Sequence, residues 1–135
     1  MMWRVVDFRE LNDITIGDSF PISTISDVLH SLGNSKYFST IDCASGFWHI
    51  PVRAEDWLKT AFSTNYSHFE YKSMPFGLKW ARATFQRLRS TVLSGMQGLK
   101  CLVYLDDNNA FGETMKVHNK LRDVLARLWM HNLKL

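Results

Sequence analysis

A short apolar run that ends in two adjacent acidic residues constrains this chain more than any other feature. Residues 101–105 are apolar or aromatic, as in a short buried strand, and Asp106 and Asp107 follow directly. Neighbouring strand residues point to opposite faces, so the two carboxylates approach one point only if the chain turns there. At about 4 Å they would repel by ~4 kcal/mol at an effective dielectric constant of 20, and Mg²⁺, a hard ion with oxygen ligands, relieves this repulsion. The run predicts a strand that delivers a metal-binding carboxylate pair to a hairpin tip.

The acidic pair also has an ordinary interpretation, because Asp106, Asp107, Asn108 and Asn109 are all common turn residues. For an isolated pair we would favour a plain polar turn by about two to one. A third carboxylate changes this balance, since Asp42 ends another predicted strand. Three converging carboxylates hold two metal ions about 3.5 to 4 Å apart, which activates an attacking hydroxyl and stabilises a leaving phosphate. Together they predict a two-metal site for nucleotidyl transfer.

Strand and helix patterns alternate along the whole chain, and no linker, low-complexity tract or repeat interrupts them. Strands are predicted at residues 3–8, 37–42 and 101–105, and a hairpin from runs 59–64 and 68–73. Helices are predicted around residues 25–32, 85–96 and 121–128. The first has a capping box from Thr24 to Asp27, and Gly33 is its C-terminal cap. We expect one α+β domain over residues 1–135, with an antiparallel sheet and helices packed on one face.

The composition supports a self-sufficient globular domain. Its 135 residues are 46% hydrophobic, enough for a core without disulfides or structural zinc, and the net charge of +3 permits nucleic-acid contact without requiring it. Cys43 and Cys101 have no metal-ligand spacing, so we expect buried thiols in a reducing compartment, with a disulfide as the minority alternative. No apolar run reaches about 18 residues and no secretion signal is recognisable, so we expect an intracellular protein that inserts in no membrane.

Several sequence blocks occur in an order that is highly specific as a set. They are residues 38–47 (FSTIDCASGF), 59–62 (KTAF), 74–79 (MPFGLK), 83–86 (ATFQ) and 104–107 (YLDD). Together they closely resemble the reverse transcriptases of gypsy-type LTR retrotransposons, and residues 4–12 (RVVDFRELN) resemble the segment that opens the fingers. The resemblance implies the palm and partial fingers of a right-hand polymerase, located in a virus-like particle in the cytoplasm. The thumb and ribonuclease H domain of the polyprotein would lie outside these residues.

The resemblance implies a role for each acidic residue. Asp42 and Asp106 would bridge two Mg²⁺ ions, with Mn²⁺ as the alternative ion, and Asp107 would be a more peripheral ligand. A primer 3′-hydroxyl would attack the α-phosphate of a deoxynucleoside triphosphate on an RNA or DNA template, and pyrophosphate would leave. The implied function is that of an RNA-directed DNA polymerase module.

The resemblance also implies contacts with the nucleotide and the template. Residues expected at the nucleotide are Arg4, Cys43, Ser45, Gly46, Phe47, Phe76 and Gly77, and residues expected at the template are Asp7, Arg9, Asn12 and Lys79. Arg4 would reach the triphosphate, and the amides of Ser45 and Gly46 would cradle phosphate oxygens. Phe47 would exclude a ribose 2′-hydroxyl. Simpler alternatives are a surface strand for Arg4, core packing for Phe47 and plain solvation for Lys79.

Two segments depart from the family pattern. Residues 80–83 (WARA) stand where the family usually has a small or polar residue and then Ala-Pro-Ala, and Asn108 and Asn109 stand where it has branched apolar residues. Asparagine is a poor strand former, so the second departure predicts a looser strand after the carboxylates. Trp80, Arg82 and the two asparagines motivate an alternative function, a decayed, non-catalytic retrotransposon fragment that retains the fold and at most binds nucleic acid.

Overall fold

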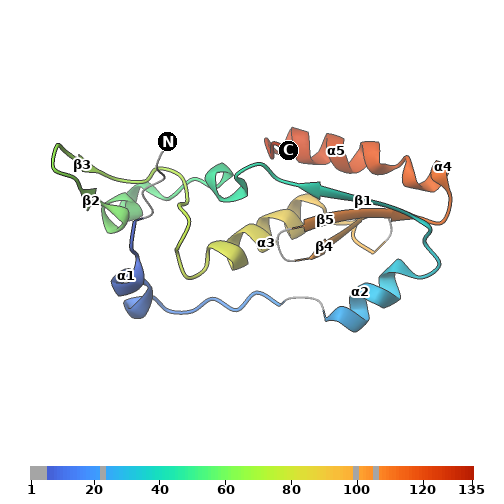
Figure 1. Cartoon of the computed structure of the whole chain (residues 1–135), viewed down its shortest axis with the longest axis horizontal. Coiled ribbons are helices and arrows are strands. Elements are labelled where there is room, and N and C mark those ends of the chain that lie inside the picture. The colour runs from blue at the N-terminus through green and yellow to red at the C-terminus, as the bar shows by residue number, and fades with distance from the viewer. Residues whose placement is uncertain (1–5, 22–23, 99–100, 105–106) are drawn as a thin grey trace. The chain divides into compact units, whose positions relative to one another are not determined.

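The computed structural model describes residues 6–21, 24–98, 101–104 and 107–135, with Tyr104 and Asp107 described by their backbone only (Figure 1). The predicted site residues Arg4 and Asp106 therefore lie outside the described residues. The chain groups into two compact units: the first is made of residues 1–19 and 45–85, and the second of residues 20–44 and 86–135. No helix within the described ranges is long and apolar enough to cross a membrane.

The first unit is built from short elements. These are α1 (Arg9–Ile14), the 3-10 helices η1 (Gly46–His49) and η2 (Ala54–Thr60), the strands β2 (Phe62–Ser63) and β3 (His68–Phe69), and the start of α3 (Ala81–Val92). β2 and β3 pair antiparallel with Phe62 opposite Phe69, which confirms the predicted hairpin but makes it shorter. The strand predicted at residues 3–8 is wrong for residues 6–8, because Phe8 is the N-cap of α1.

The first strand of the predicted hairpin is also wrong at residues 59–60, which belong to η2. The Thr60 hydroxyl explains the difference, because it donates to the carbonyl of Trp57 (2.7 Å) and so closes the 3-10 turn. The same oxygen accepts from the amide of Tyr71 (2.9 Å), which ties η2 to the segment after β3. Tyr71 in turn lies 6.0 Å from both Phe8 and Trp48, measured between ring centroids, so aromatic packing joins these short elements.

The second unit begins with α2 (Ile25–Leu32), whose ends follow the predicted signals. The Thr24 hydroxyl accepts from the amide of Asp27 (3.2 Å), and the Asp27 carboxylate accepts from the amide of Thr24 (3.1 Å). Both halves of the predicted capping box are therefore confirmed. Gly33 caps the helix as predicted and has a positive φ of 47°, but its ψ of −126° lies outside the left-handed helical region expected of such a cap.

An antiparallel sheet of three strands forms the centre of the second unit, and Figure 1 shows β5 (Asp107–Gly112) between β1 (Tyr37–Asp42) and β4 (Cys101–Tyr104). The register of β1 and β5 runs from Tyr37 opposite Gly112 to Asp42 opposite Asp107. The strands predicted at 37–42 and, over its described part, at 101–105 are confirmed. Together with the helices, the antiparallel sheets confirm the predicted α+β class.

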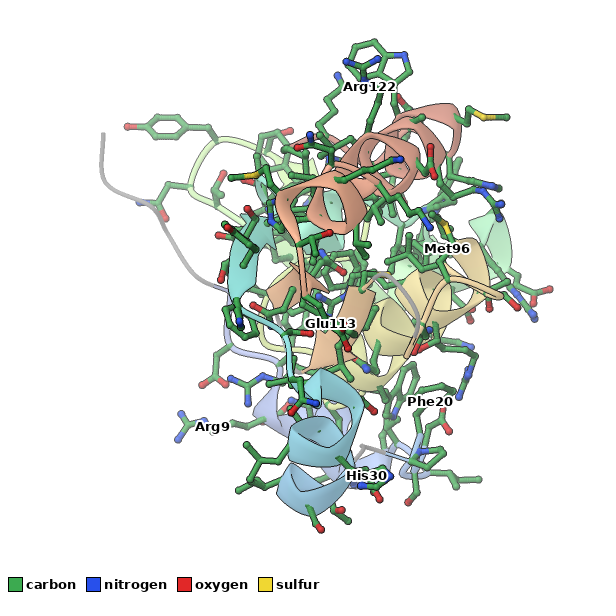
Figure 2. The ribbon with its side chains drawn as sticks, turned by 90° about the vertical axis from the view of Figure 1, so that its right-hand side faces the viewer. Arg9, Phe20, His30, Met96, Glu113 and Arg122 are labelled. Atoms are coloured by element: carbon green, nitrogen blue, oxygen red, sulfur yellow. The ribbon has the colours of Figure 1, made fainter. Side chains whose placement is uncertain are left out.

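Helices cover this sheet. Residues 86–92 of α3, the short α4 (Met115–His118) and α5 (Leu121–Met130) belong to this unit. The helix predicted near 121–128 is confirmed, and so is the helix predicted near 85–96, except that it ends at Val92 and residues 93–96 form turns. Leu93, Val124 and Leu128 are fully buried. The outer side of α5 is exposed, and Figure 2 shows Arg122 pointing away from the sheet. The apolar stripes of α3 and α5 thus supply core residues, as helical spacing requires, whereas α4 buries none of its side chains.

Candidate functional site at the ends of strands β1 and β5

Asp42 and Asp107 are neighbours across two strands of the second unit. β1 ends at Asp42, β5 begins at Asp107, and the two residues are partners in the antiparallel register. The Cα atoms of such partners lie about 4.5–5.5 Å apart, so the register alone brings these residues together from distant parts of the sequence. Ile41 and Cys43 are buried whereas Asp42 is exposed, as strand alternation requires. The Asp42 carboxylate is therefore accessible to a ligand.

The donor set fits a hard cation. An exposed carboxylate opposite a second acidic residue offers oxygen ligands, and Mg²⁺ is usually bound by one or two carboxylates while it keeps several waters. Asp106, the third predicted ligand, lies outside the described residues. Among the residues that the structure describes, no three Asp, Glu, His or Cys side chains are grouped closely enough to hold a metal ion.

Two asparagines hold the strand that begins at Asp107. Asn108 is fully buried, and its Nδ2 donates to the carbonyl of Ile41 (3.3 Å) and to Sγ of Cys43 (3.7 Å). Asn109 accepts from the hydroxyl of Thr40 (2.9 Å). The turn predicted at 107–109 is wrong, because these residues belong to β5. The cross-strand hydrogen bonds of the two asparagines compensate for their poor strand propensity.

A buried polar cluster, made of Gln86, Arg89, Asn108 and Cys43, packs behind the strand ends, and sequence reasoning missed it. Arg89 is fully buried, and its Nη2 donates to Oε1 of Gln86 (2.9 Å). Gln86 donates through Nε2 to the carbonyl of Val103 on β4 (3.3 Å). Burial raises the pKa of the Cys43 thiol, and the nearby positive charge of Arg89 and the hydrogen bond from Asn108 oppose that rise. The thiol is therefore neutral near pH 7.

The residues predicted at the nucleotide phosphates form a tight corner in the first unit. Ser45 has left-handed backbone angles (φ 51°, ψ 46°), and its carbonyl accepts from the amide of Trp48 (2.9 Å). Gly46 lies against the ring of Phe85, where an added Cβ would be only 2.4 Å from Cζ. The second residue of this corner has to be glycine for steric reasons.

The rings of the predicted nucleotide-binding residues Phe47 and Phe76 are held in edge-to-face contacts. Phe47 lies 5.2 Å from Phe76 and 5.6 Å from Phe85, measured between ring centroids. Phe76 keeps 49% of its surface exposed, and Gly77 follows it with a φ of 94°. Both proposed roles of Phe47 stay open, because a ring that packs against its neighbours is also held firmly enough to act as a steric gate.

Residues predicted at the template strand make contacts within the first unit. Nδ2 of Asn12 donates to the carbonyl of Gly77 (2.7 Å), and Oδ1 of Asn12 accepts from the amide of Lys79 (2.8 Å). Nζ of Lys79 donates to the carbonyls of Asn12 (3.3 Å) and Thr15 (3.1 Å), so this lysine is not simply solvated. These bonds join α1 to the turn at residues 76–79.

Asp7 and Arg9, the other two predicted template residues, form an exposed ion pair. Nε of Arg9 donates to both carboxylate oxygens of Asp7, at 3.0 and 2.9 Å. This hydrogen bonding lowers the pKa of the Asp7 carboxyl and raises the pKa of Arg9. The pair places an exposed guanidinium at the start of α1.

The whole chain, residues 1–135, matches the family model described as reverse transcriptase (RNA-dependent DNA polymerase). The chain belongs to the reverse transcriptase family. Its relatives include the Pol polyproteins of the Drosophila melanogaster transposons 297 and opus, which are 46% and 48% identical over 97% and 96% of this chain. An RNA-directed DNA polymerase homolog from Oenothera berteroana is 37% identical over 76% of this chain and 72% of its own length. The resemblance to retrotransposon reverse transcriptases is confirmed.

Solved reverse transcriptase structures share this fold. The foamy viral protease-reverse transcriptase in complex with an RNA/DNA hybrid matches 93% of the chain with a TM-score of 0.80 at 28% identity, over 17% of that protein. A form described as dRH in complex with double-stranded DNA matches 96% of the chain with a TM-score of 0.82 at 27% identity, over 23% of that protein. The chain spans only 12% and 13% of the two transposon polyproteins. The chain therefore matches one part of each of these Pol polyproteins.

Proposed function

We propose that this chain is the palm and partial fingers of a reverse transcriptase, and that it adds deoxynucleotides to a primer 3′-hydroxyl by two-metal nucleotidyl transfer. The observation that carries the proposal is the register pairing of Asp42 with Asp107. These are two of the three acidic residues to which the family resemblance assigns metal binding. Membership of the reverse transcriptase family and the foamy viral complexes with nucleic acid support the same function.

In this proposal Asp42 and Asp106 hold two divalent ions, Mg²⁺ or Mn²⁺, and Asp107 is a peripheral ligand. A two-metal site supplies activation of an attacking hydroxyl and charge stabilisation of a leaving phosphate. The chain itself positions the acidic residues. β1 and β5 hold Asp42 opposite Asp107, and the buried side chains of Ile41 and Cys43 anchor the strand end that carries the Asp42 carboxylate. The backbones of Asp42 and Asp107 are thereby arranged before any ion binds, which lowers the cost of assembling the site.

The remaining residues bind and orient the substrates. Arg4 and the backbone amides of Ser45 and Gly46 bind the triphosphate, because cationic and amide donors suit phosphate oxygens. Cys43 lies beside them in the sequence. Phe47 excludes a nucleotide that carries a ribose 2′-hydroxyl. Phe76 and Gly77 lie against the nascent base pair. The template strand, RNA or DNA, is positioned by the residues Asp7, Arg9, Asn12 and Lys79.

The metal site is tested by titrating the chain with Mn²⁺ and following the loss of the free-ion EPR signal. A carboxylate about 4 Å from a unit charge contributes up to ~4 kcal/mol at an effective dielectric constant of 20, and solvent reduces this at an exposed site. Since 1.4 kcal/mol is tenfold, Asp42→Asn should weaken Mn²⁺ binding by on the order of tenfold or more. Asp13→Asn makes the same chemical change on an exposed part of α1 and should have no effect. Equal affinities of wild type and Asp42→Asn would contradict the proposed metal site.

Catalysis is tested in a chimera in which this chain replaces the matching segment of the opus polyprotein. The opus polyprotein then supplies the rest of the enzyme. At 48% identity the chimera should extend a primer on an RNA template. Asp42→Asn in the chimera should reduce extension by on the order of a hundredfold or more, since it removes an anionic ligand from a site whose metal ions supply several kcal/mol of charge stabilisation. An active chimera whose rate does not respond to Asp42→Asn would exclude the proposed chemistry.

A further inference from the structure

We propose that Asn108 is a positioning residue for Asp42, an inference that rests on the function proposed above. Its side chain leaves β5 and reaches β1 on both sides of the carboxylate residue. Nδ2 donates to the carbonyl of Ile41 at 3.3 Å and to Sγ of Cys43 at 3.7 Å. A single amide therefore fixes the residue before Asp42 and the residue after it. We call this pair of contacts the amide clamp.

The amide clamp has one orientation. The carbonyl of Ile41 can only accept a hydrogen bond, so the NH₂ end of the Asn108 side chain must face β1. Its two hydrogens then serve two acceptors, the Ile41 oxygen and the weaker sulfur of Cys43. A reversed amide would place its oxygen against the Ile41 carbonyl, where two acceptors repel. Because Asn108 is fully buried, water does not compete for these contacts.

The clamp holds the chain closer to Asp42 than the other hydrogen bonds near this residue do. Asn109, the next residue on β5, bonds the Thr40 hydroxyl and so contacts β1 two residues before Asp42. On the other side, the amide of Ala44 donates to the carbonyl of Lys134 (3.0 Å) and holds the chain two residues after Asp42. Asn108 alone among these contacts holds both residues that flank the carboxylate. A branched apolar side chain at position 108 would fill the space and leave both contacts unmade.

Asn108→Leu tests the clamp, because leucine has a similar branched shape and no donor. Groups that orient a metal ligand typically change metal affinity by 10–100-fold when removed, so Mn²⁺ affinity of the chain should fall on the order of tenfold. Stability should stay the same or rise, since leucine also removes Oδ1 of Asn108, a buried oxygen without a hydrogen-bond partner in the part of the chain that the structure describes. A residue with a purely structural role would lower the urea midpoint and leave Mn²⁺ affinity of the folded protein unchanged. Asn109→Leu is the matched control and should leave Mn²⁺ affinity unchanged.

Hydrogen exchange gives a second readout that needs no metal. A peptide covering residues 40–44 should exchange faster in Asn108→Leu than in wild type or Asn109→Leu, because the carbonyl of Ile41 and the side chain of Cys43 have lost their hydrogen-bond donor. If Asn108→Leu does not fold, Asn108→Ala removes the same donors without adding volume and is read in the same way. Wild-type Mn²⁺ affinity together with wild-type exchange at 40–44 would overturn the clamp. If wild type itself binds no Mn²⁺, the proposed function fails, and the exchange of residues 40–44 alone decides the clamp.

Discussion

Replacing Gly46 with alanine should push Phe85 out of place and destabilise the first unit. A Cβ on Gly46 would lie 2.4 Å from Cζ and 2.7 Å from Cε1 of Phe85, whereas ordinary contacts begin at 3.4 Å, so one group must move by about 1 Å. Phe85 is only 3% exposed and its ring contacts Phe47, so the ring cannot relieve the clash by turning into solvent. Overpacking of this kind costs ~1–3 kcal/mol, and we expect about 2 kcal/mol here.

Urea unfolding of the chain measures this cost, and two further variants test its cause. Gly17→Ala is the control, because its Cβ would meet only Cε of Lys79, at 4.0 Å, and the free energy of unfolding should change by no more than ~0.5 kcal/mol. In the double variant Gly46→Ala with Phe85→Leu, the smaller side chain makes room for the added methyl group. Its cost should fall short of the sum of the two single costs by ~0.5 kcal/mol or more. Strictly additive costs would refute the steric explanation.

Other substitutions probe the second unit by the same urea assay. Gly112→Ala would place a Cβ 2.6 Å from the backbone nitrogen of His118, and since backbone yields less than a ring we expect a loss of at least ~2 kcal/mol; a neutral result would contradict the close packing of β5 on α4. Thr24→Ala breaks the capping box of α2 and should cost ~1 kcal/mol. Hydrogen bonds from the Thr24 side chain and amide lower the pKa of Asp27 in the folded protein. The stability that these bonds contribute is therefore present above the carboxyl pKa of the unfolded chain, and it is lost as the pH falls through the carboxyl pKa of the folded protein. The difference between wild type and Thr24→Ala should therefore shrink below about pH 4, and a constant difference down to pH 2 would argue against this linkage.

Elements whose signals are local could be predicted from the sequence. The bounds of β1 and the ends of α2 follow from apolar periodicity and from the chemistry of Thr24, Asp27 and Gly33. The approach of Asp42 to Asp107 was also predictable. Asp42 ends one predicted strand, Asp107 comes after another, and a compact sheet places the two strands together. Their partner positions were not, since register depends on contacts along both strands.

Elements that depend on distant partners could not be predicted. α1 has no buried residue, and the hydrogen bonds of Asn12 to Gly77 and Lys79 join it to a turn far along the chain. Propensity alone places Asn108 in a turn, whereas its contacts across to β1 hold it in a strand. Arg89 follows Phe85 by one helical turn, so it falls on the buried stripe of α3, and this spacing was the one signal that could have revealed a buried guanidinium.

The pairing of β1 with β5 runs without a bulge to its last position, and this limits how the segment can vary in length. Side chains alternate along a strand, so inserting or deleting one residue between Tyr37 and Ile41 would turn Ile41 outward and Asp42 into the core. Substitutions that keep the polarity of each position leave Asp42 where it is. Viable relatives of this protein should therefore differ in the composition of this segment while they keep its residue count.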